Sequence, residues 1–259
     1  MNAKILLLAC VVTMPLARAG QTYEAPPRIS PAIETSRSDW EFSFALYAPL
    51  MGLDGDIAVA GLAPTNVDLD FGDIWDTLDG GLSGAFEARW NRWSINADAI
   101  WLKVSDAGLP SGTSYLRFSE EEIMASLSIG FALYETQSTT LDFLAGAAVT
   151  SMDVDLDLMT VPTAITSGSG SQEWIDPYIG LRLRQNLGDR WTLFATGLYG
   201  GFDVSSDEYW QVIAGIGYRI TECTTLALAY RIISVDYHQG GFVYDVDSSG
   251  PNLGLVFRF

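Results

Sequence analysis

One stretch decides the fold of this chain: Gly250-Pro251-Asn252-Leu253-Gly254-Leu255-Val256-Phe257-Arg258-Phe259. After the Gly-Pro turn, apolar side chains occupy every second position, and mostly polar or small residues lie between them. A period of two residues is typical of a β-strand with one apolar and one polar face. The sequence therefore predicts a two-faced strand at its C-terminal end.

The same alternation recurs upstream, in segments that begin near Trp40, Leu82, Trp93, Ile123, Leu141, Pro177, Trp191, Trp210 and Leu226. With the closing strand they predict ten strands, joined by four tight turns and five longer loops, and eight strands is the main alternative. The strand at Trp191 is the most ambiguous, because Phe194 and Leu198 interrupt its polar face. We predict an all-β fold, a transmembrane antiparallel up-and-down β-barrel, with a soluble β-sandwich as the alternative.

The longer connections contain some structure of their own. In residues 50–80 we expect a hairpin, with strands at Ile57–Gly61 and Val67–Phe71, and then a helical turn at Asp73–Asp79. Three further segments are predicted as loops: Ser105–Glu121, the segment that holds Asp153, Asp155, Asp157 and the run Ser167–Ser171, and Asp236–Ser249.

Residues 1–19 have the features of a secretory signal peptide. A short positive start is followed by an apolar run and by a small-x-small site at Ala17-Arg18-Ala19. A lipoprotein box at Leu7-Leu8-Ala9-Cys10 is the alternative for this segment. We expect residues 20–38 to be a periplasmic lead-in and residues 39–259 to form the barrel.

The chain is strongly acidic, with 14 basic and 32 acidic residues and a formal charge of −18. Removal of Lys4 and Arg18 with the signal peptide would make this −20, so nucleic acid is an unfavourable partner. Cys223 would then be the one cysteine, which excludes an intramolecular disulfide. No apolar run after residue 19 is long enough for a transmembrane helix.

The most specific motifs lie in residues 173–259. They include Gly200-Gly201-Phe202, Gly215-x-Gly217-Tyr218-Arg219, Tyr230-Arg231, Gly241-Phe242-x-Tyr244-Asp245 and the closing strand. This pattern resembles small Gram-negative outer-membrane β-barrel proteins of the porin-like, OmpA- or OmpW-like superfamily. The resemblance implies an outer-membrane location, with membrane lipid and lipopolysaccharide as surroundings. It also implies assembly by the outer-membrane insertion machinery, for which Leu253, Leu255, Phe257 and Phe259 would be the signal.

Tryptophans at the predicted strand ends are expected to form the interfacial girdle of the barrel: Trp40, Trp90, Trp93, Trp174, Trp191 and Trp210. Charged residues of both signs occupy the polar positions of the alternating strands, and we predict that they face the lumen. These residues are Glu41, Glu87, Arg89, Asp98, Glu122, Asp142, Asp176, Arg182, Arg184, Arg219, Arg231 and Arg258. We expect these charges to plug the lumen with ion pairs. The alternative is a narrow charged pore.

The acidic residues in excess over the basic ones should lie in the outer loops, where divalent cations are candidate partners. Asp153, Asp155 and Asp157 offer oxygen ligands of the kind that Ca²⁺ prefers, although no complete ligand loop follows them. The single histidine, His238, stands two residues after Asp236. This Asp-x-His resembles part of the omptin protease site, so a hydrolase at the barrel rim, omptin-like or lipid-modifying, is an alternative function.

The sequence predicts, on balance, an outer-membrane barrel of the structural or interaction type with acidic extracellular loops. A narrow porin-like channel for small solutes is the first alternative, and the rim-sited hydrolase is the second. We expect no enzymatic activity, no catalytic residues, no cofactor and no metal centre.

Overall fold

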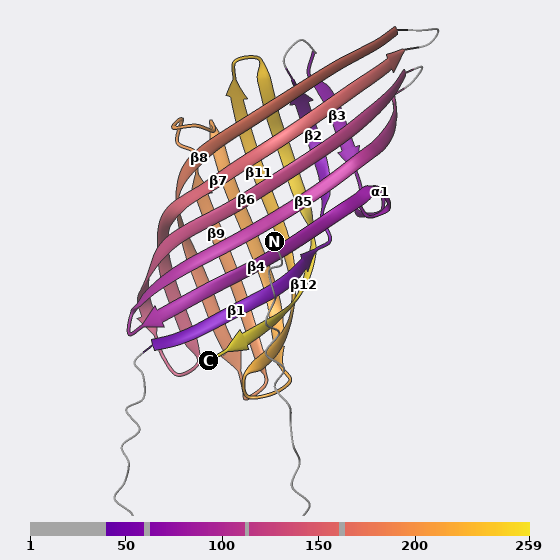
Figure 1. The fold of residues 1–259 in the computed structure, drawn as a ribbon. Coiled ribbons are helices and arrows are strands. Elements are labelled where there is room, and N and C mark those ends of the chain that lie inside the picture. The colour runs from indigo at the N-terminus through magenta and orange to yellow at the C-terminus, as the bar shows by residue number, and fades with distance from the viewer. Residues whose placement is uncertain (1–39, 60–62, 112–113, 161–163) are drawn as a thin grey trace, which may run out of the picture. The chain divides into compact units, whose positions relative to one another are not determined.

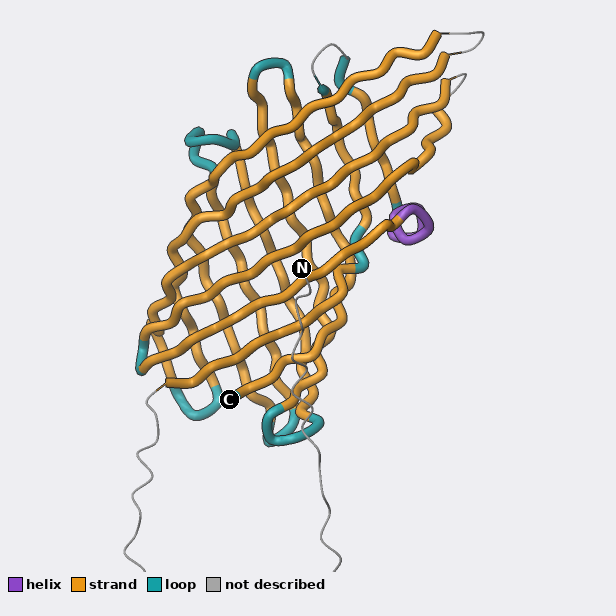
Figure 2. The backbone as a smooth tube through the Cα atoms, viewed as in Figure 1, coloured by secondary structure: helices purple, strands orange, loops and turns teal. Residues whose placement is uncertain are grey.

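The computed structural model describes residues 40–59, 63–111, 114–160 and 164–259. The predicted signal peptide (1–19) and lead-in (20–38) lie outside the described residues. The described part of the chain contains no helix that is long and apolar enough to cross a membrane. Figure 2 shows that strands make up nearly all of it.

Ten described strands form a closed antiparallel barrel (Figure 1). The barrel closes where the first strand pairs with the last, from Ser43↔Arg258 to Pro49↔Asn252. The prediction of ten barrel strands is therefore confirmed, and the alternatives of eight strands and of a sandwich are wrong. The barrel strands are β1 (Trp40–Pro49), β4 (Leu78–Trp90), β5 (Trp93–Ser111), β6 (Ser114–Glu135), β7 (Thr139–Thr160), β8 (Ala164–Leu187), β9 (Trp191–Gly200), β10 (Glu208–Arg219), β11 (Thr224–Gln239) and β12 (Phe242–Arg258).

Two extra strands and one helix fill the long connection between β1 and β4. The strands β2 (Gly52–Ala58) and β3 (Thr65–Leu69) form a hairpin, and β2 pairs with the first half of β12, in line with β1. The helix α1 (Phe71–Thr77) begins after Asp70, whose side chain accepts a hydrogen bond from the Asp73 backbone in a capping box. The predicted hairpin and helical turn are both present, with shifted ends.

The two ends of the barrel differ. At the short-turn end the strands are joined by the brief turns at residues 91–92, 136–138, 188–190 and 220–223. At the opposite, long-strand end, β5 to β8 continue far beyond the other strands (Figure 1). Three predicted loops are therefore wrong. Ser105–Glu121 belongs mostly to β5 and β6, Asp153–Asp157 lies within β7, and Asp236–Ser249 forms the hairpin of β11 and β12 with its turn at Gly240-Gly241.

These errors have one physical cause. Beyond the apolar belt, the outward face of a strand meets water, and its residues become polar although the ladder continues. Asp153, Asp155 and Asp157 face outward in this way and lie opposite Ser171, Ser169 and Ser167 of β8. The polar, Ser- and Gly-rich composition that predicts a loop here marks a solvated strand pair.

An apolar belt surrounds the outside of the barrel, as a membrane-spanning barrel requires. On β6 the belt runs from Ile123 to Leu133, with Leu127 and Ile129 about 60% exposed. Trp40, Trp90, Trp93 and Trp191 are exposed at the short-turn end, as a girdle would be. Trp174 contradicts the girdle prediction, because it points inward and is 4% exposed.

The interior changes character along the barrel. The half near the short-turn end holds charged side chains, whereas the long-strand end is filled by an apolar core that includes Val154, Val235 and Tyr244. Above the ends of β9 and β10, β8 approaches β11 directly, and the Trp174 and Tyr237 rings stack with centroids 4.2 Å apart. Gly170 of β8 likewise lies against Phe242 of β12. The long-strand end is thus packed like a sandwich of two sheet faces.

Candidate functional site

Five of the charged residues predicted for the lumen meet in one cluster, which we call the lumen network: Glu87, Arg89, Asp142, Arg182 and Arg184. The Asp142 carboxylate accepts hydrogen bonds from Arg89 at 2.7 Å and from Arg182 and Arg184 at 3.1 Å. Glu87 accepts a hydrogen bond from Arg184 at 2.8 Å. Because Glu87 and Arg89 come from β4 and the others from β7 and β8, the network crosses the lumen.

A second ion pair lies deeper in the barrel. Arg231 of β11 donates to Asp98 of β5 at 2.6 Å and to the Tyr47 hydroxyl at 2.9 Å, and Tyr47 donates to Asp98 at 2.8 Å. Tyr47 was not among the residues of the predicted lumen network, because that set was limited to charged side chains. A hydroxyl at an inward position of β1 was the available signal.

The other predicted lumen residues are not brought into these clusters. Asp176 accepts hydrogen bonds from Trp174 and from the backbone and hydroxyl of Ser206, so it ties the loop after β9 to β8. Glu122 lies in the apolar core. In the described part of the chain, Glu41, Arg219 and Arg258 make no ion pair within 4.0 Å, and all three lie near the short-turn end.

Two cavities lie in the lumen on either side of the lumen network. One of about 680 Å³ is lined by residues near the short-turn end, including Glu41, Glu135 and Arg258. The other, of about 230 Å³, extends from the network to Tyr178 and Arg231. Beyond Tyr178 the stacked Trp174 and Tyr237 rings and the apolar core occupy the interior.

A pair of acidic residues is buried in this core, beyond the belt residue Ile123. Glu120 and Glu122 are 5% and 8% exposed, and one oxygen of each has no hydrogen-bond partner. Burial raises the pKa of Glu122 to about 7. Burial and repulsion from Glu122 raise the pKa of Glu120 well above its usual range. Both carboxyl groups therefore favour the protonated form.

Carboxylates form two rows on the outside of the long-strand end, which we call the outer acidic rows. In the first, Asp236 lies opposite Asp245, and Asp245 lies opposite Asp56. In the second, Asp247 lies opposite Asp54, and Asp54 lies opposite Asp68. Neighbouring strands are about 4.8 Å apart, so like charges stand side by side across four strands. Partial burial and the charge of Asp236 raise the pKa of Asp245.

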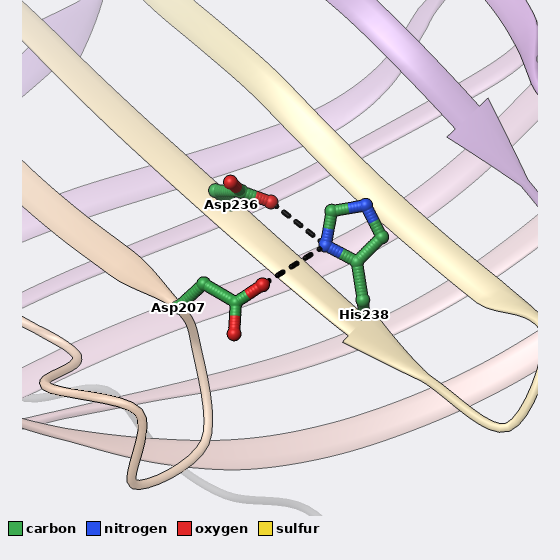
Figure 3. Close-up of side chains that lie close together, drawn as sticks. All are labelled: Asp207, Asp236 and His238. Carbon is green, nitrogen blue, oxygen red and sulfur yellow. Dashed lines mark ion pairs between the residues drawn. The ribbon is translucent and has the colours of Figure 1, made fainter.

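Next to these rows, His238 joins two carboxylates (Figure 3). Its Nδ1 lies 2.8 Å from Asp236 Oδ1 and 3.4 Å from Asp207 Oδ2. Asp236 and His238 share the outward face of β11, and Asp207 comes from the loop before β10. One ligand atom from each residue lies within 4.8 Å of the others, as in a site for a metal ion. Sequence reasoning paired His238 with Asp236 but missed Asp207, which is distant in sequence.

The contacts of His238 that the described residues show are with carboxylates, and none of them is with a serine, threonine or cysteine. These contacts describe an imidazole held between two carboxylates.

A closed antiparallel barrel with an apolar belt, exposed tryptophans at one end and a charged interior is the fold of an outer-membrane β-barrel protein. No family model and no curated protein matches the chain. Solved structures with some similarity include Neisserial surface protein A, at 15% identity and a TM-score of 0.34 over 86% of this chain and 98% of that one.

Two further structures show similarity at the same level. Ail, the attachment invasion locus protein of Yersinia pestis, is 11% identical with a TM-score of 0.31, over 85% of this chain and 98% of that one. The CymD monoaromatic hydrocarbon channel is 10% identical with a TM-score of 0.34, over 85% and 87%. The fold assignment rests on the strand ladder and not on these distant similarities.

Proposed function

We propose that the protein is an outer-membrane barrel with a closed lumen, which uses the outer acidic rows at its extracellular end to bind positively charged partners. In barrels of this class the short turns face the periplasm and the longer connections face outward. The long-strand end would then project from the cell surface. On this proposal the role is one of interaction and not of catalysis.

The observation that carries the proposal is the segregation of charge. Six of the nine described arginines lie inside the barrel, where Arg89 and Arg231 are at most 9% exposed. Asp54, Asp245 and Asp247 stand exposed on adjacent strands with like charges opposite one another. Like charges at directly opposite positions destabilise a sheet. A cationic partner would offset that repulsion and would be attracted by all of these carboxylates together.

The test uses the refolded protein in detergent micelles and an immobilised oligolysine peptide as the probe. The variant Asp54→Asn/Asp245→Asn/Asp247→Asn removes three charges from the outer acidic rows. We expect it to bind roughly tenfold more weakly at low salt, since exposed ion pairs contribute about 0.2–1 kcal/mol each and 1.4 kcal/mol is tenfold. Added salt should weaken the wild-type binding.

The matched control is Asp153→Asn/Asp155→Asn/Asp157→Asn, which removes the same charge from the outward face of β7. This control should keep most of the wild-type affinity. An equal loss in both variants would show that only net charge matters, and it would contradict a site at the outer acidic rows.

The alternative of a narrow channel is supported by the two lumen cavities. Against it stand the lumen network and the stacked rings of Trp174 and Tyr237, which a solute would have to pass. The alternative of a rim-sited hydrolase is supported by the contact of His238 with Asp236 alone. We therefore favour the interaction role.

A further inference from the structure

A notch interrupts the barrel wall between β1 and β4. The two strands pair from Trp40↔Trp90 to Leu46↔Gly84, and their described pairing ends there. Beyond this point β1 continues alongside β12, and Leu78–Ser83 of β4 continues alongside β5. The helix α1 directly precedes Leu78 and lies at the upper end of β4 (Figure 1).

The notch encloses a cavity of about 690 Å³ with apolar walls, formed mainly by Leu46, Leu50, Phe71, Trp75, Leu78 and Leu82. This volume falls in the range of about 300–1,000 Å³ that is typical of sites for small ligands. Its lining includes the hydroxyl-bearing residues Tyr47 and Ser83, and the Tyr47 hydroxyl is already bonded to Asp98 and Arg231. The cavity therefore suits a hydrocarbon and not a polar solute.

The notch is continuous with the apolar belt. Leu46, Leu82 and Leu253 line it and also face outward, with exposed fractions of 45%, 67% and 48%. These residues belong to the surface that meets the hydrocarbon chains of a bilayer. The notch therefore opens directly onto the membrane, so a lipid chain reaches it without leaving the hydrocarbon layer.

The helix α1 fits a position at the border of that layer. One side of the helix is an apolar stripe of residues at helical spacing, formed by Phe71, Ile74, Trp75 and Leu78. Asp73 and Asp76 lie on the other side. Trp75 is 60% exposed, and its ring lies 5.7 Å from that of Phe71. Short amphipathic segments with tryptophan are typical of the membrane interface.

We propose that the notch is a binding site for one acyl chain of a lipid in the surrounding membrane, which enters between β1 and β4 and packs beneath α1. An empty apolar cavity loses the dispersion contacts of its walls. An ordered chain in the notch would fill the cavity and supply the missing dispersion contacts to its apolar walls. This site is independent of the outer acidic rows.

The experiment uses the protein refolded into liposomes of a phospholipid that carries a photoactivatable diazirine near the end of one acyl chain. After illumination, the crosslinked peptides are identified by mass spectrometry. We expect crosslinks in 46–50 and 71–82 to be several-fold enriched over those in 123–133, a belt segment of β6 away from the notch. Equal labelling of the three segments would overturn the proposal.

A filling variant, Ala48→Trp, tests the site itself, because Ala48 is exposed and lines the notch. The matched control is Ala145→Trp, an exposed belt position on β7. We expect the first variant to lose the enrichment and the second to keep it. If Ala48→Trp does not give the gel mobility of a folded barrel, Leu50→Trp serves as the filling variant. Enrichment that survives in a folded filling variant would overturn the proposal.

A competition experiment distinguishes two occupants of the notch, a lipid acyl chain and a free apolar solute. Naphthalene is added at concentrations that leave the labelling of 123–133 unchanged. We expect the enrichment in 46–50 and 71–82 to persist, since the surrounding lipid is present in large excess. Selective loss of that enrichment would make a free hydrocarbon the occupant and would contradict the proposal.

Discussion

At the scale of single residues, burial decides which charges pair. Asp142 is 0% exposed and is held by three guanidinium groups. Removal of one partner from such a buried pair typically costs about 3–5 kcal/mol, which is why both signs are retained together in the lumen network. Glu120 and Glu122 differ, since no described basic side chain reaches them and their carboxyl groups are uncompensated unless protonated.

This difference predicts a pH-dependent stability. A carboxyl group whose folded-state pKa is raised stabilises the fold most at a pH below its unfolded pKa, and the effect is lost as pH rises through the folded pKa. For Glu122 that window runs from about 4.5 to about 7. We expect the urea midpoint of the wild type to fall between pH 5 and pH 8.5, and the fall to be smaller in Glu120→Gln/Glu122→Gln.

The measurement is urea unfolding in detergent, followed by tryptophan fluorescence at both pH values. The difference between wild type and variant isolates these two groups from the other titrating residues of the protein, such as Asp245. Parallel pH profiles for the two proteins would show that the buried pair does not titrate in this window.

At the scale of elements, the sequence predicted the strands in which apolar and polar residues alternate with a uniform period of two. The closing strand and the barrel strands were found because their apolar positions face lipid and their polar positions face the lumen. The strand extensions beyond the belt were missed because the polarity of the two strand faces is reversed there. The outward face is polar and the inward face is apolar. Val154 between Asp153 and Asp155 shows this exchange within β7. The ambiguous Phe194 and Leu198 of β9 prove to be inward-facing residues.

The candidate site was less predictable for a related reason. Strand alternation identifies inward positions, so Glu87, Arg89, Asp142, Arg182 and Arg184 could be named together. The alternation does not determine the register between strands that are far apart in the sequence. The meeting of Asp207 with His238 and the alignment of Asp54 with Asp247 depend on that register. They could not be read from a single sequence.

The pairing of β2 with β12 depends on Gly55. This residue has φ of +155°, and a Cβ atom there would lie about 2.1 Å from the Asp245 carbonyl oxygen. We expect Gly55→Ala to push β2 away from β12, to expose the β2–β3 hairpin to limited proteolysis and to destabilise the protein by more than about 1 kcal/mol. Gly197→Ala, where no atom lies within 4 Å of the added Cβ, should behave like the wild type. Equal proteolysis of both variants would refute this dependence.

At the scale of the whole molecule, the barrel is built in layers along its axis. A cavity near the short-turn end leads to the lumen network, a smaller cavity follows, and the apolar core closes the long-strand end. Outside, the apolar belt is followed by the outer acidic rows. The apolar belt suits the hydrocarbon layer and the outer acidic rows suit water, and the short turns at the opposite end are the basis for the proposed orientation.

The closed lumen is the central claim, and planar-bilayer conductance of the refolded protein tests it most directly. Before the measurement, the shift in gel mobility on boiling should establish that the barrel is folded. We predict a silent bilayer, because the lumen network and the Trp174–Tyr237 stack lie in the lumen where a solute would have to pass. Stable conductance steps from the folded barrel, altered when Arg182 or Glu87 is neutralised, would contradict the account and would make the lumen a channel.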